Sequence, residues 1–449
     1  MSGTGEDVSV AAGGAGRPGY RYVVVAMLTL VYTFNFLDRQ ILSVLAEPIR
    51  KELHLSDTQL GLLTGLTFAL FYTTFGIPLA WLADRTRRIW IVAGALSVWS
   101  LFSAACDLAG NFAQLALARI GVGVGEAGGS PPSHSLISDY FPPAQRGTAL
   151  GLLSIGAPLG GALGVGVGGA IAAAHGWRAA FMVVGLSGLV LAALVLLIVR
   201  EPLRGRMDPL GDGQTHEPSP PLGRGIAEFF ADPVLRCTAL GAGCSAFLAF
   251  GIGNWAPAFL IRVRHMEMGD LALYFGLVVG FAGVVGVAGS GWLVDRLRRY
   301  SPRAYALVPG AATLISLPFF IGFLMAPTWP LAVASFAVST VLNGVYLAPA
   351  MTVVQNAVAP SRRSLSSALF MFIFNLIGMG GGPLFVGMIS DRMHGSFGEL
   401  SLQIGLAALT PVFLLTALAH YATSRAIGKQ VGAGEGRLGR LDAQVQAAR

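Results

Sequence analysis

The chain has 449 residues, of which 54% are hydrophobic and 12% are charged, and its mean hydropathy is +0.66. These values exclude a soluble globular protein and indicate a chain embedded in a lipid bilayer. The net charge of +7 does not indicate nucleic-acid binding, because the basic residues, nearly all Arg, lie mostly in short loops beside apolar runs. That placement is a signal of membrane topology.

Twelve apolar segments are each long enough for a helix that crosses a bilayer, which takes about 20 residues. Residues 1–19, rich in Gly, Ala and Ser, are expected to form a disordered tail. The first six segments lie at residues 20–46, 57–83, 88–106, 112–139, 144–173 and 177–199. Residues 200–233 are polar and rich in proline, and we interpret them as a linker. The last six segments lie at residues 234–261, 269–294, 303–325, 328–357, 361–390 and 398–422, before a polar tail at 423–449.

A repeated stretch relates the two sets of segments. W-L-A-D-R-T-R-R at residues 81–88 returns as W-L-V-D-R-L-R-R at residues 292–299, and Gly65-Leu66 and Gly276-Leu277 keep the same offset of 211 positions. A duplicated apolar helix followed by a basic turn indicates two related halves with an interface between them. The predicted fold class is an all-α membrane protein of two pseudo-symmetric six-helix bundles, residues 20–199 and 234–422.

The distribution of basic residues predicts the orientation. One side holds both tails, the linker and the two repeated turns, which contain most of the Lys and Arg residues. The other side holds only Arg50, Lys51, Arg178, Arg262, Arg264 and Arg392. We therefore expect a multi-pass protein of the cytoplasmic (inner) membrane with both termini in the cytoplasm. Three cysteines, Cys106, Cys237 and Cys244, form no C-x-x-C pair, so we expect neither a metal site nor a cofactor.

Twelve helices with this repeated turn resemble the major facilitator superfamily, whose signature between helices 2 and 3 approximates G-x-L-A-D-R-x-G-R-R. Ala80 and Arg87 stand in place of its two glycines here, and Gly291 restores the first glycine in the second copy. G-W-R-A-A-F at residues 176–181 also resembles the superfamily's turn between helices 5 and 6. The resemblance implies conformational gating by the repeated turns, which supply Asp84, Arg85, Arg88, Asp295, Arg296 and Arg299.

Three shorter motifs are similar to those of the spinster family of lipid and sphingolipid transporters. They are N-F-L-D-R at residues 35–39, S-D-x-x-x-G-L-L at 56–63 and G-x-G-E-A at 123–127. This resemblance implies an amphipathic, lipid-like substrate of the lysolipid or sphingoid type.

Helices 1 and 4 carry four charged residues at membrane depth, where an ionised group costs at least about 2.5 kcal/mol. They are Asp38 and Arg39 in helix 1, and Arg119 and Glu126 in helix 4. We predict that Glu126 couples transport to protons with Arg39 as its switchable partner, and Asp38 is a further candidate. The alternative is a static ion pair that holds helices together. Arg39 and Arg119 are also candidates for binding the substrate.

Asp57 allows two interpretations. A short acidic residue at the start of a helix commonly caps its free amides, whereas the resemblance implies a titrating group at the outer mouth of the pathway. We include Asp57 among the proton-coupling candidates.

The second half offers a different wall of the predicted cavity. Asn254, Trp255, Tyr346 and Phe250 lie in helices 7 and 10 and are expected to contact the substrate. A cavity charged on one wall and aromatic on the other suits an amphipathic ligand with an anionic or zwitterionic head. The alternative is that these rings only pack helices.

Several other motifs are less informative than they look. Gly123 to Gly128 fits G-x-G-x-x-G, but within an apolar span such glycines indicate close helix packing and not a dinucleotide site. Ser130, His134 and Ser135 have no oriented third member, so nucleophilic catalysis is not expected and the protein is predicted not to be an enzyme. Helix 5 resembles the superfamily's antiporter motif G-x-x-x-G-P-x-x-G-G, but Ala157 interrupts the Gly-Pro step.

The function predicted from these observations is a proton-coupled secondary transporter that works by alternating access as a monomer. Its partners are protons, membrane lipids and a small amphipathic substrate, with no nucleic acid. The alternatives are a multidrug or small-solute efflux antiporter and, from a different class, a scramblase-like channel or a membrane enzyme.

Overall fold

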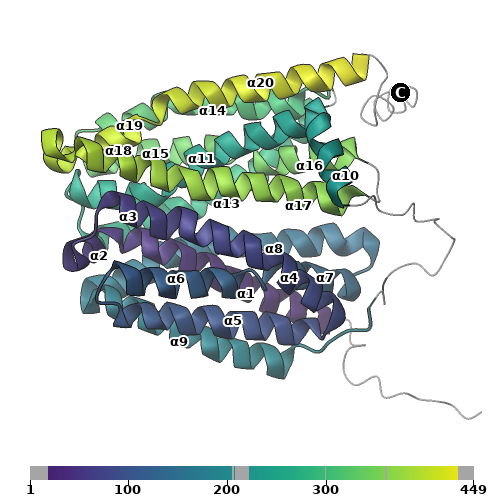
Figure 1. Cartoon of the computed structure of the whole chain (residues 1–449), viewed down its shortest axis with the longest axis horizontal. Helices are drawn as coiled ribbons and strands as arrows, with labels where there is room; N and C mark the ends of the chain where they lie inside the picture. The colour runs from purple at the N-terminus through teal and green to yellow at the C-terminus, as the bar shows by residue number, and fades with distance from the viewer. Residues whose placement is uncertain (1–18, 205–206, 208–221, 299, 359–361, 433–449) are drawn as a thin grey trace, which may run out of the picture.

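The computed structural model describes residues 19–204, 207, 222–298, 300–358 and 362–432. Over these residues the chain is helical, without a strand. Figure 1 shows two helical bundles lying side by side along their long axes, one containing α1 to α9 and the other α10 to α20.

The N-terminal bundle is built from nine α-helices joined by short turns. They are α1 (Tyr20–Val44), α2 (Ala46–Leu53), α3 (Asp57–Gly61), α4 (Thr67–Arg85), α5 (Arg88–Ala105), α6 (Phe112–Glu126), α7 (Ser130–Tyr140), α8 (Pro143–Leu163) and α9 (Gly169–Ile198). Two π-helical turns, η1 (Leu62–Leu66) and η3 (Gly164–Gly168), lie within otherwise continuous spans, and a 3-10 turn, η2 (Cys106–Leu108), follows α5.

The C-terminal bundle has the same plan. Its helices are α10 (Leu222–Ala231), α11 (Pro233–Arg262), α12 (Met268–Asp270), α13 (Gly276–Leu297), α14 (Ala304–Met325), α15 (Trp329–Asn343), α16 (Leu347–Ala357), α17 (Arg363–Phe374), α18 (Gly382–Phe397), α19 (Ser401–Ala407) and α20 (Thr410–Gly432). Its π-helical turns are η4 (Leu271–Phe275) and η6 (Asn375–Gly381), and a 3-10 turn, η7 (Gly398–Leu400), follows α18.

Twelve membrane crossings account for this architecture. Nine helical stretches of the described chain are long and apolar enough to cross a membrane. Two of them, Gln145–Ile198 with 54 residues and Leu365–Gly432 with 68, are long enough for two crossings each. They turn at Gly176 and Gly398, whose φ angles of 83° and 54° favour glycine. The α6–α7 pair supplies the remaining crossing, so the predicted all-α fold of twelve helices is confirmed.

The structure differs from the expected segments at four places. Helix 4 is broken at residues 127–129, between Glu126 at the end of α6 and Ser130 at the start of α7, whose first turn contains Pro131 and Pro132. Helix 10 is also broken, at residues 344–346 between α15 and α16. The expected linker contains the helix α10, whose Phe229 is buried against the C-terminal bundle. Finally, α20 continues to Gly432, well into the expected C-terminal tail.

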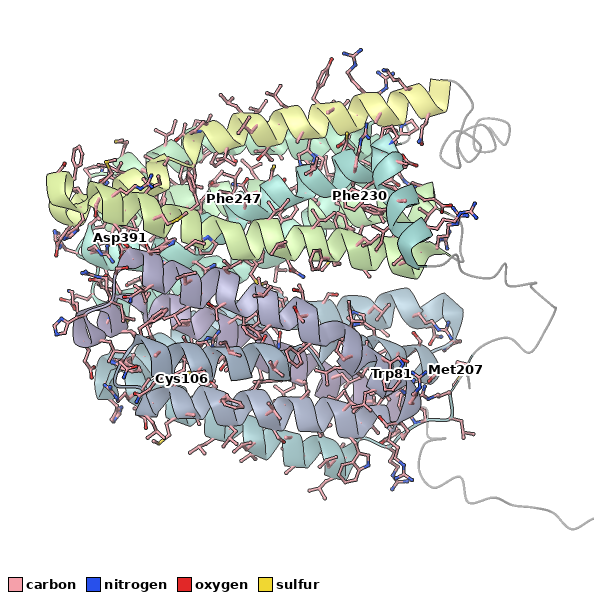
Figure 2. All side chains as sticks on the ribbon, viewed as in Figure 1. Trp81, Cys106, Met207, Phe230, Phe247 and Asp391 are labelled. Atoms are coloured by element: carbon pink, nitrogen blue, oxygen red, sulfur yellow. The ribbon has the colours of Figure 1, made fainter. Side chains whose placement is uncertain are left out.

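The two ends of the molecule differ in how the halves meet. We call the end with the start of α1, Trp81 and the connection between the halves the tail end, and the end with α2, α3 and Asp391 the far end (Figure 2). The largest hydrophobic cluster joins both halves near the far end, through residues such as Leu45 and Leu60 from one half and Phe259 and Leu271 from the other. Separate clusters stabilise mainly one half each towards the tail end.

Candidate functional site

The four charged residues predicted inside the spans lie together in the N-terminal half. Arg39 Nε donates to Glu126 Oε2 at 2.6 Å, which joins α1 to the last residue of α6. Arg119 Nη1 donates to Asp38 Oδ2 at 3.0 Å, and Ser103 on α5 donates to the other oxygen of Asp38. Two cations and two carboxylates therefore form one cluster that is neutral when all four are ionised.

Glycines bring the helices of this cluster close together. A Cβ on Gly125 would lie 2.5 Å from the backbone nitrogen of Trp99, and one on Gly123 would lie 3.3 Å from the carbonyl oxygen of Phe68. The G-x-G-E motif therefore packs α6 against α5 and α4 and delivers Glu126 to Arg39. This is the close packing of small residues expected in lipid, and not a dinucleotide site.

Exposure separates the four residues. The Arg39 side chain is 17% exposed, whereas those of Glu126, Arg119 and Asp38 are at most 2% exposed. Arg39 is therefore the member that a ligand can reach, and the expectation that Arg119 contacts the substrate does not fit this conformation. Within the described part of the chain, Glu126 Oε1 and Arg119 Nε have no hydrogen-bond partner.

Aromatic rings that the sequence reasoning did not single out surround Arg39. Phe36 lies on α1, and Phe68 and Tyr72 lie on α4, with their ring centroids 4.7–5.2 Å from the guanidinium carbon. The spacing of three residues from Phe36 to Arg39 and of four from Phe68 to Tyr72 is a helical-face signal that would have found them.

The expected aromatic wall in the other half is only partly formed. Phe250 and Tyr346 are half-buried and contact Phe374, with ring centroids 6.3 and 6.0 Å apart. Trp255 does not fit the expectation, because it is 1% exposed and its indole donates to the carbonyl oxygen of Pro383 at 2.8 Å. It packs α11 on α18 and does not line a cavity.

Asn254 contacts the other half of the protein. Ser43 on α1 donates to its Oδ1 at 2.5 Å, and its Nδ2 donates to the carbonyl oxygen of Phe250 at 2.9 Å. In this conformation the Asn254 side chain thus closes the interface between α1 and α11, where a contact with substrate was expected.

A second charged cluster, which we call the far-end latch, consists of Glu47, Asp57 and Arg262. Arg262 on α11 donates from both Nη atoms to Asp57 at 2.8 and 2.9 Å and from Nε to Glu47 at 2.9 Å. All three side chains are at most 5% exposed. Glu47 and Asp57 belong to the N-terminal half and Arg262 to the C-terminal half, so the latch joins the two halves.

The capping interpretation of Asp57 is wrong, because Ser56 caps α3 in a capping box with Gln59. The freed carboxylate of Asp57 instead accepts hydrogen bonds from Arg262 and from Ser390 at 2.6 Å. Asp391 accepts the backbone N–H groups of Asp57 and Thr58 at 2.9 and 2.8 Å, which adds a further contact between the halves.

Arg262 of the latch and the neighbouring Arg50 set the charge state of Glu47. Burial raises the pKa of this carboxyl, but hydrogen bonds from Arg50 and Arg262 outweigh burial and hold the pKa below its ordinary value. Glu47 is therefore an anion at neutral pH and attracts the Arg262 guanidinium across the interface.

The repeated basic turns lie at the tail end. Asp84 is the penultimate residue of α4, and Asp295 lies in the last turn of α13. The side chains of both residues, and all of Arg299, lie outside the described residues. The guanidinium groups of Arg85 and Arg296 lie over Trp81 and Trp292, at 3.8 and 5.8 Å.

Arg88 differs from the other basic residues of its turn. It is 2% exposed and pairs with Asp139 on α7 at 2.5 Å and with Glu201 at 2.8 Å. It also donates to Ser135 at 2.8 Å. Arg88 therefore ties α5 to α7 and to the start of the connection between the halves.

Ser130 and His134 contact each other within α7. His134 Nδ1 contacts the carbonyl oxygen of Ser130 at 2.7 Å, which is a contact within one helix. Across the described part of the chain, no group of three or more His, Cys, Asp or Glu side chains is placed to hold a metal ion.

Comparisons with known proteins agree with this architecture. The family model of the Major Facilitator Superfamily matches residues 28–383. An MFS-type efflux pump of Mycolicibacterium smegmatis is 33% identical over 408 residues, covering 90% of this chain and 92% of that protein. Protein spinster homolog 1 of Mus musculus is 29% identical over 402 residues, covering 84% of this chain and 75% of that protein.

A solved structure is also similar over nearly the whole chain. It is a bacterial homologue of the human lysosomal transporter spinster in an inward-facing and unoccupied conformation, with a TM-score of 0.83 and 30% identity. The similarity covers 92% of this chain and 98% of that one.

Proposed function

Since this chain belongs to the major facilitator superfamily and is a spinster-like transporter, not an enzyme, we propose that it is a proton-coupled secondary transporter of an amphipathic, lipid-like substrate. It works by alternating access as a monomer in the cytoplasmic membrane, with the tail end in the cytoplasm. The observation that carries the proposal is the Arg39–Glu126 ion pair.

Proton coupling follows from the charge balance of the cluster around Arg39. With all four residues ionised the cluster is neutral, and one proton on Glu126 gives it a net charge of +1. That charge releases Arg39 from Glu126 and makes it available to an anionic head group. The lack of a described partner for Glu126 Oε1 supports this role, because that oxygen can take a proton without first breaking a hydrogen bond.

Asp38 is the second carboxylate of the same cluster. A proton on Asp38 changes the net charge by the same amount, but it frees Arg119, whose side chain is 2% exposed. We therefore assign the principal proton to Glu126 and a secondary role to Asp38.

The proposed chemistry of the ligand follows from the groups that the two halves offer. The N-terminal half presents a cation, and the C-terminal half presents the half-buried rings of Phe250 and Tyr346, which pack on Phe374. An amphipathic molecule of the lysolipid or sphingoid type matches both walls, with its anionic or zwitterionic head near Arg39.

The far-end latch supports a conformation in which the far end is closed. With Arg262 joined to Asp57 and Glu47, the far end is closed while Arg39 keeps 17% exposure. If the far end faces outwards, this is an inward-facing state. Asp57 then acts at the outer mouth as a partner of the gate through its ion pair with Arg262.

A second candidate function is efflux of drugs or small solutes by antiport. The observation that favours it is the 33% identity to a protein named as an MFS-type efflux pump. The two functions differ in the ligand, and a screen of purified protein with lysolipids, sphingoid bases and drugs separates them. A scramblase-like channel is distinguished by flux that needs no pH gradient.

The decisive experiment replaces Glu126 with Gln and measures transport in proteoliposomes with and without a pH step. We expect the variant to fold and bind ligand but to lose the dependence of transport on the pH gradient. Glu52→Gln is the matched control, because Glu52 is 49% exposed and pairs with Trp177 and Arg178.

Two results would contradict the coupling role. Full gradient-driven transport by Glu126→Gln would end it, and Asp57 would become the next residue to test. A large fall in melting temperature with no change in coupling would show that the Arg39–Glu126 pair only holds helices together.

A further inference from the structure

We infer that Phe36, Phe68 and Tyr72 form an aromatic cage that positions Arg39 and sets the transporter's preference for an anionic head group. This inference rests on the proposed function, because it concerns what Arg39 does once Glu126 has released it. It adds three residues from two helices to the substrate site.

Three aromatic rings lie close to the guanidinium of Arg39. The guanidinium carbon of Arg39 lies 5.2 Å from the ring centroid of Phe36, 4.8 Å from that of Phe68 and 4.7 Å from that of Tyr72. All three distances are within the range of about 6 Å over which an aromatic ring attracts a cation. Arg39 therefore has a second set of favourable contacts besides Glu126.

The cage is held in place independently of Arg39. Phe68 is 2% exposed, and its ring stacks on Tyr72 with centroids 5.6 Å apart and planes 18° apart. Phe36 packs edge-on against Tyr32 at 5.1 Å. Because Gly123 lets α6 approach the backbone of Phe68, the rings sit on closely packed helices and keep their positions when one contact changes.

The proton on Glu126 creates the need for these rings. Once Glu126 is neutral, Arg39 loses its counter-ion at membrane depth, where a bare cation is costly. The π faces stabilise the charged guanidinium in either protonation state of Glu126, by about 30-fold in an equilibrium constant for a desolvated contact. Arg39 thus stays near its place without collapsing onto another group of the protein.

A guanidinium held in this way selects its ligand by geometry. The guanidinium carbon of Arg39 lies over the rings of Phe68 and Tyr72, and these rings keep the group in place after Nε has left Glu126. Its planar fork matches the two oxygens of a phosphate or a carboxylate. A neutral head group gains nothing from this arrangement, so the cage favours anionic amphiphiles over uncharged ones of equal chain length.

The test compares binding of three probes to purified protein at a pH where the wild type binds. The probes are 1-acylglycerol 3-phosphate, 1-acylglycerol with the same acyl chain, and glycerol 3-phosphate without a chain. Tyr72→Leu should weaken binding of the acyl phosphate about 10-fold to 30-fold and leave binding of the neutral lipid unchanged. Glycerol 3-phosphate shows whether free phosphate compounds share the site.

The control variants separate the cage from general packing. Phe75→Leu removes another ring of α4, which stacks on Phe71 and is 39% exposed, and should leave the selectivity unchanged. Tyr72→Phe keeps the π face and should also keep the selectivity. Phe36→Leu removes a cage ring from the other helix and should repeat the effect of Tyr72→Leu, which covers the case in which that variant folds poorly.

The outcomes distinguish the cage from the proposed function. Equal weakening of the charged and neutral lipids, or no change in either, would overturn the cage. Arg39→Lys then tests the proposed function itself, since a lysine keeps the charge but loses the planar fork. If Arg39→Lys loses the selectivity while Tyr72→Leu and Phe36→Leu keep it, the proposed function stands without the cage. If all three variants keep the selectivity, the result contradicts both the cage and the proposed function.

Discussion

Arg262 carries the strongest polar contact between the two halves at the far end. It binds two carboxylates of the opposite half, and all three side chains are buried. Removing one member of such a buried ion pair leaves an uncompensated charge and costs about 3–5 kcal/mol in the conformation that holds the pair. In a transporter that cost falls on one conformation, because opening the far end exposes the charges to water.

We therefore expect Arg262→Gln to shift the protein towards a state open at the far end. Spin labels at exposed residues His54 and Glu267 should report a longer distance between the halves than in the wild type. Arg264→Gln is the control, because Arg264 donates to the carbonyl oxygen of Leu324 within its own half. An unchanged distance distribution for Arg262→Gln would show that the apolar contacts alone keep the far end closed.

The lowered pKa of Glu47 predicts how the far-end latch responds to acid. A carboxyl whose pKa is lowered in the closed state stabilises that state above its ordinary pKa of about 4.3, and this contribution is lost only as the pH falls through the lowered value. Between pH 8 and pH 5 the contribution of Glu47 to closure should therefore stay constant.

The measurement follows the same spin-label distance from pH 8 to pH 5 in a Glu126→Gln background, which removes the proposed proton site. We expect no opening with acid in this background and a longer distance at every pH once Glu47→Gln is added. Opening of the single variant between pH 7 and pH 5 would show that another group of the far end titrates there.

At the level of single residues, the sequence shows which charged side chains lie inside a span, but it does not show which residues of the other half they contact. An ionised side chain in an apolar span needs a counter-ion, which is why Asp38, Arg39, Arg119 and Glu126 could be expected to lie together. The far-end latch could not be predicted, because Asp57 and Arg262 are 205 positions apart and meet only when the halves dock. The burial of Trp255 was missed for the same reason, since any apolar face of a membrane helix can face lipid, protein or cavity.

Among the helices, the contact of α8 with α1 decides where Asp38 and Arg39 lie. Gly156 and Gly160 on α8 and Gly164 at the start of η3 form a stripe of glycines. A Cβ on Gly160 would lie 2.2 Å from the carbonyl oxygen of Thr33. The two backbones therefore touch without an intervening side chain at Thr33, which is five residues before Asp38 and six before Arg39.

Gly160→Ala should separate α1 from α8 and destabilise the fold by about 1–3 kcal/mol, the usual cost of overpacking. Gly151→Ala is the matched control on the same helix, where a Cβ would meet nothing within 4 Å. It should be neutral or slightly stabilising, by up to about 1 kcal/mol. Thermal unfolding in detergent compares the two, and equal melting temperatures would show that α1 shifts without cost.

Irregular helices were the part of the fold that the sequence did not reveal. Each apolar span was visible, but the breaks in helices 4 and 10 were not, because glycine and proline are common in membrane helices and only some of them interrupt one. The helix α10 was hidden because its ten residues follow a proline-rich stretch that is typical of a linker.

The whole molecule is organised around two seams between its halves. At one seam η1 packs next to η6, and at the other η3 packs next to η4. A Cβ on Gly65 would lie 2.9 Å from the carbonyl oxygen of Met379, and one on Gly276 would lie 3.2 Å from the nitrogen of Gly166. Wide π-helical turns therefore meet π-helical turns where the halves must move past each other, and such turns are frequent at functional sites.

We expect the repeated basic turns to control the rocking of the two halves about these seams. Because Asp84 and Asp295 occupy matched positions at the tail end, we predict that they control exchange between conformations more than affinity. Asp84→Asn should change the ratio of the two open states, measured by spin-label distances at both ends. It should leave ligand affinity in the open state within a few-fold. A large loss of affinity at an unchanged ratio would count against this role.

The hydrogen bond between Ser43 and Asn254 joins residues 211 positions apart, the same offset that relates the two basic turns. η3 and η6, which begin at Gly164 and Asn375, keep that offset as well. Position 43 therefore touches its own counterpart, as happens at the two-fold axis of a homodimer. The chain has the form of a dimer whose subunits were fused into one polypeptide. Fusion frees the two copies to diverge. Phe250 occupies the position in the second half that corresponds to Arg39 in the first half. One ancestral position therefore serves ion chemistry in one half and aromatic contact in the other.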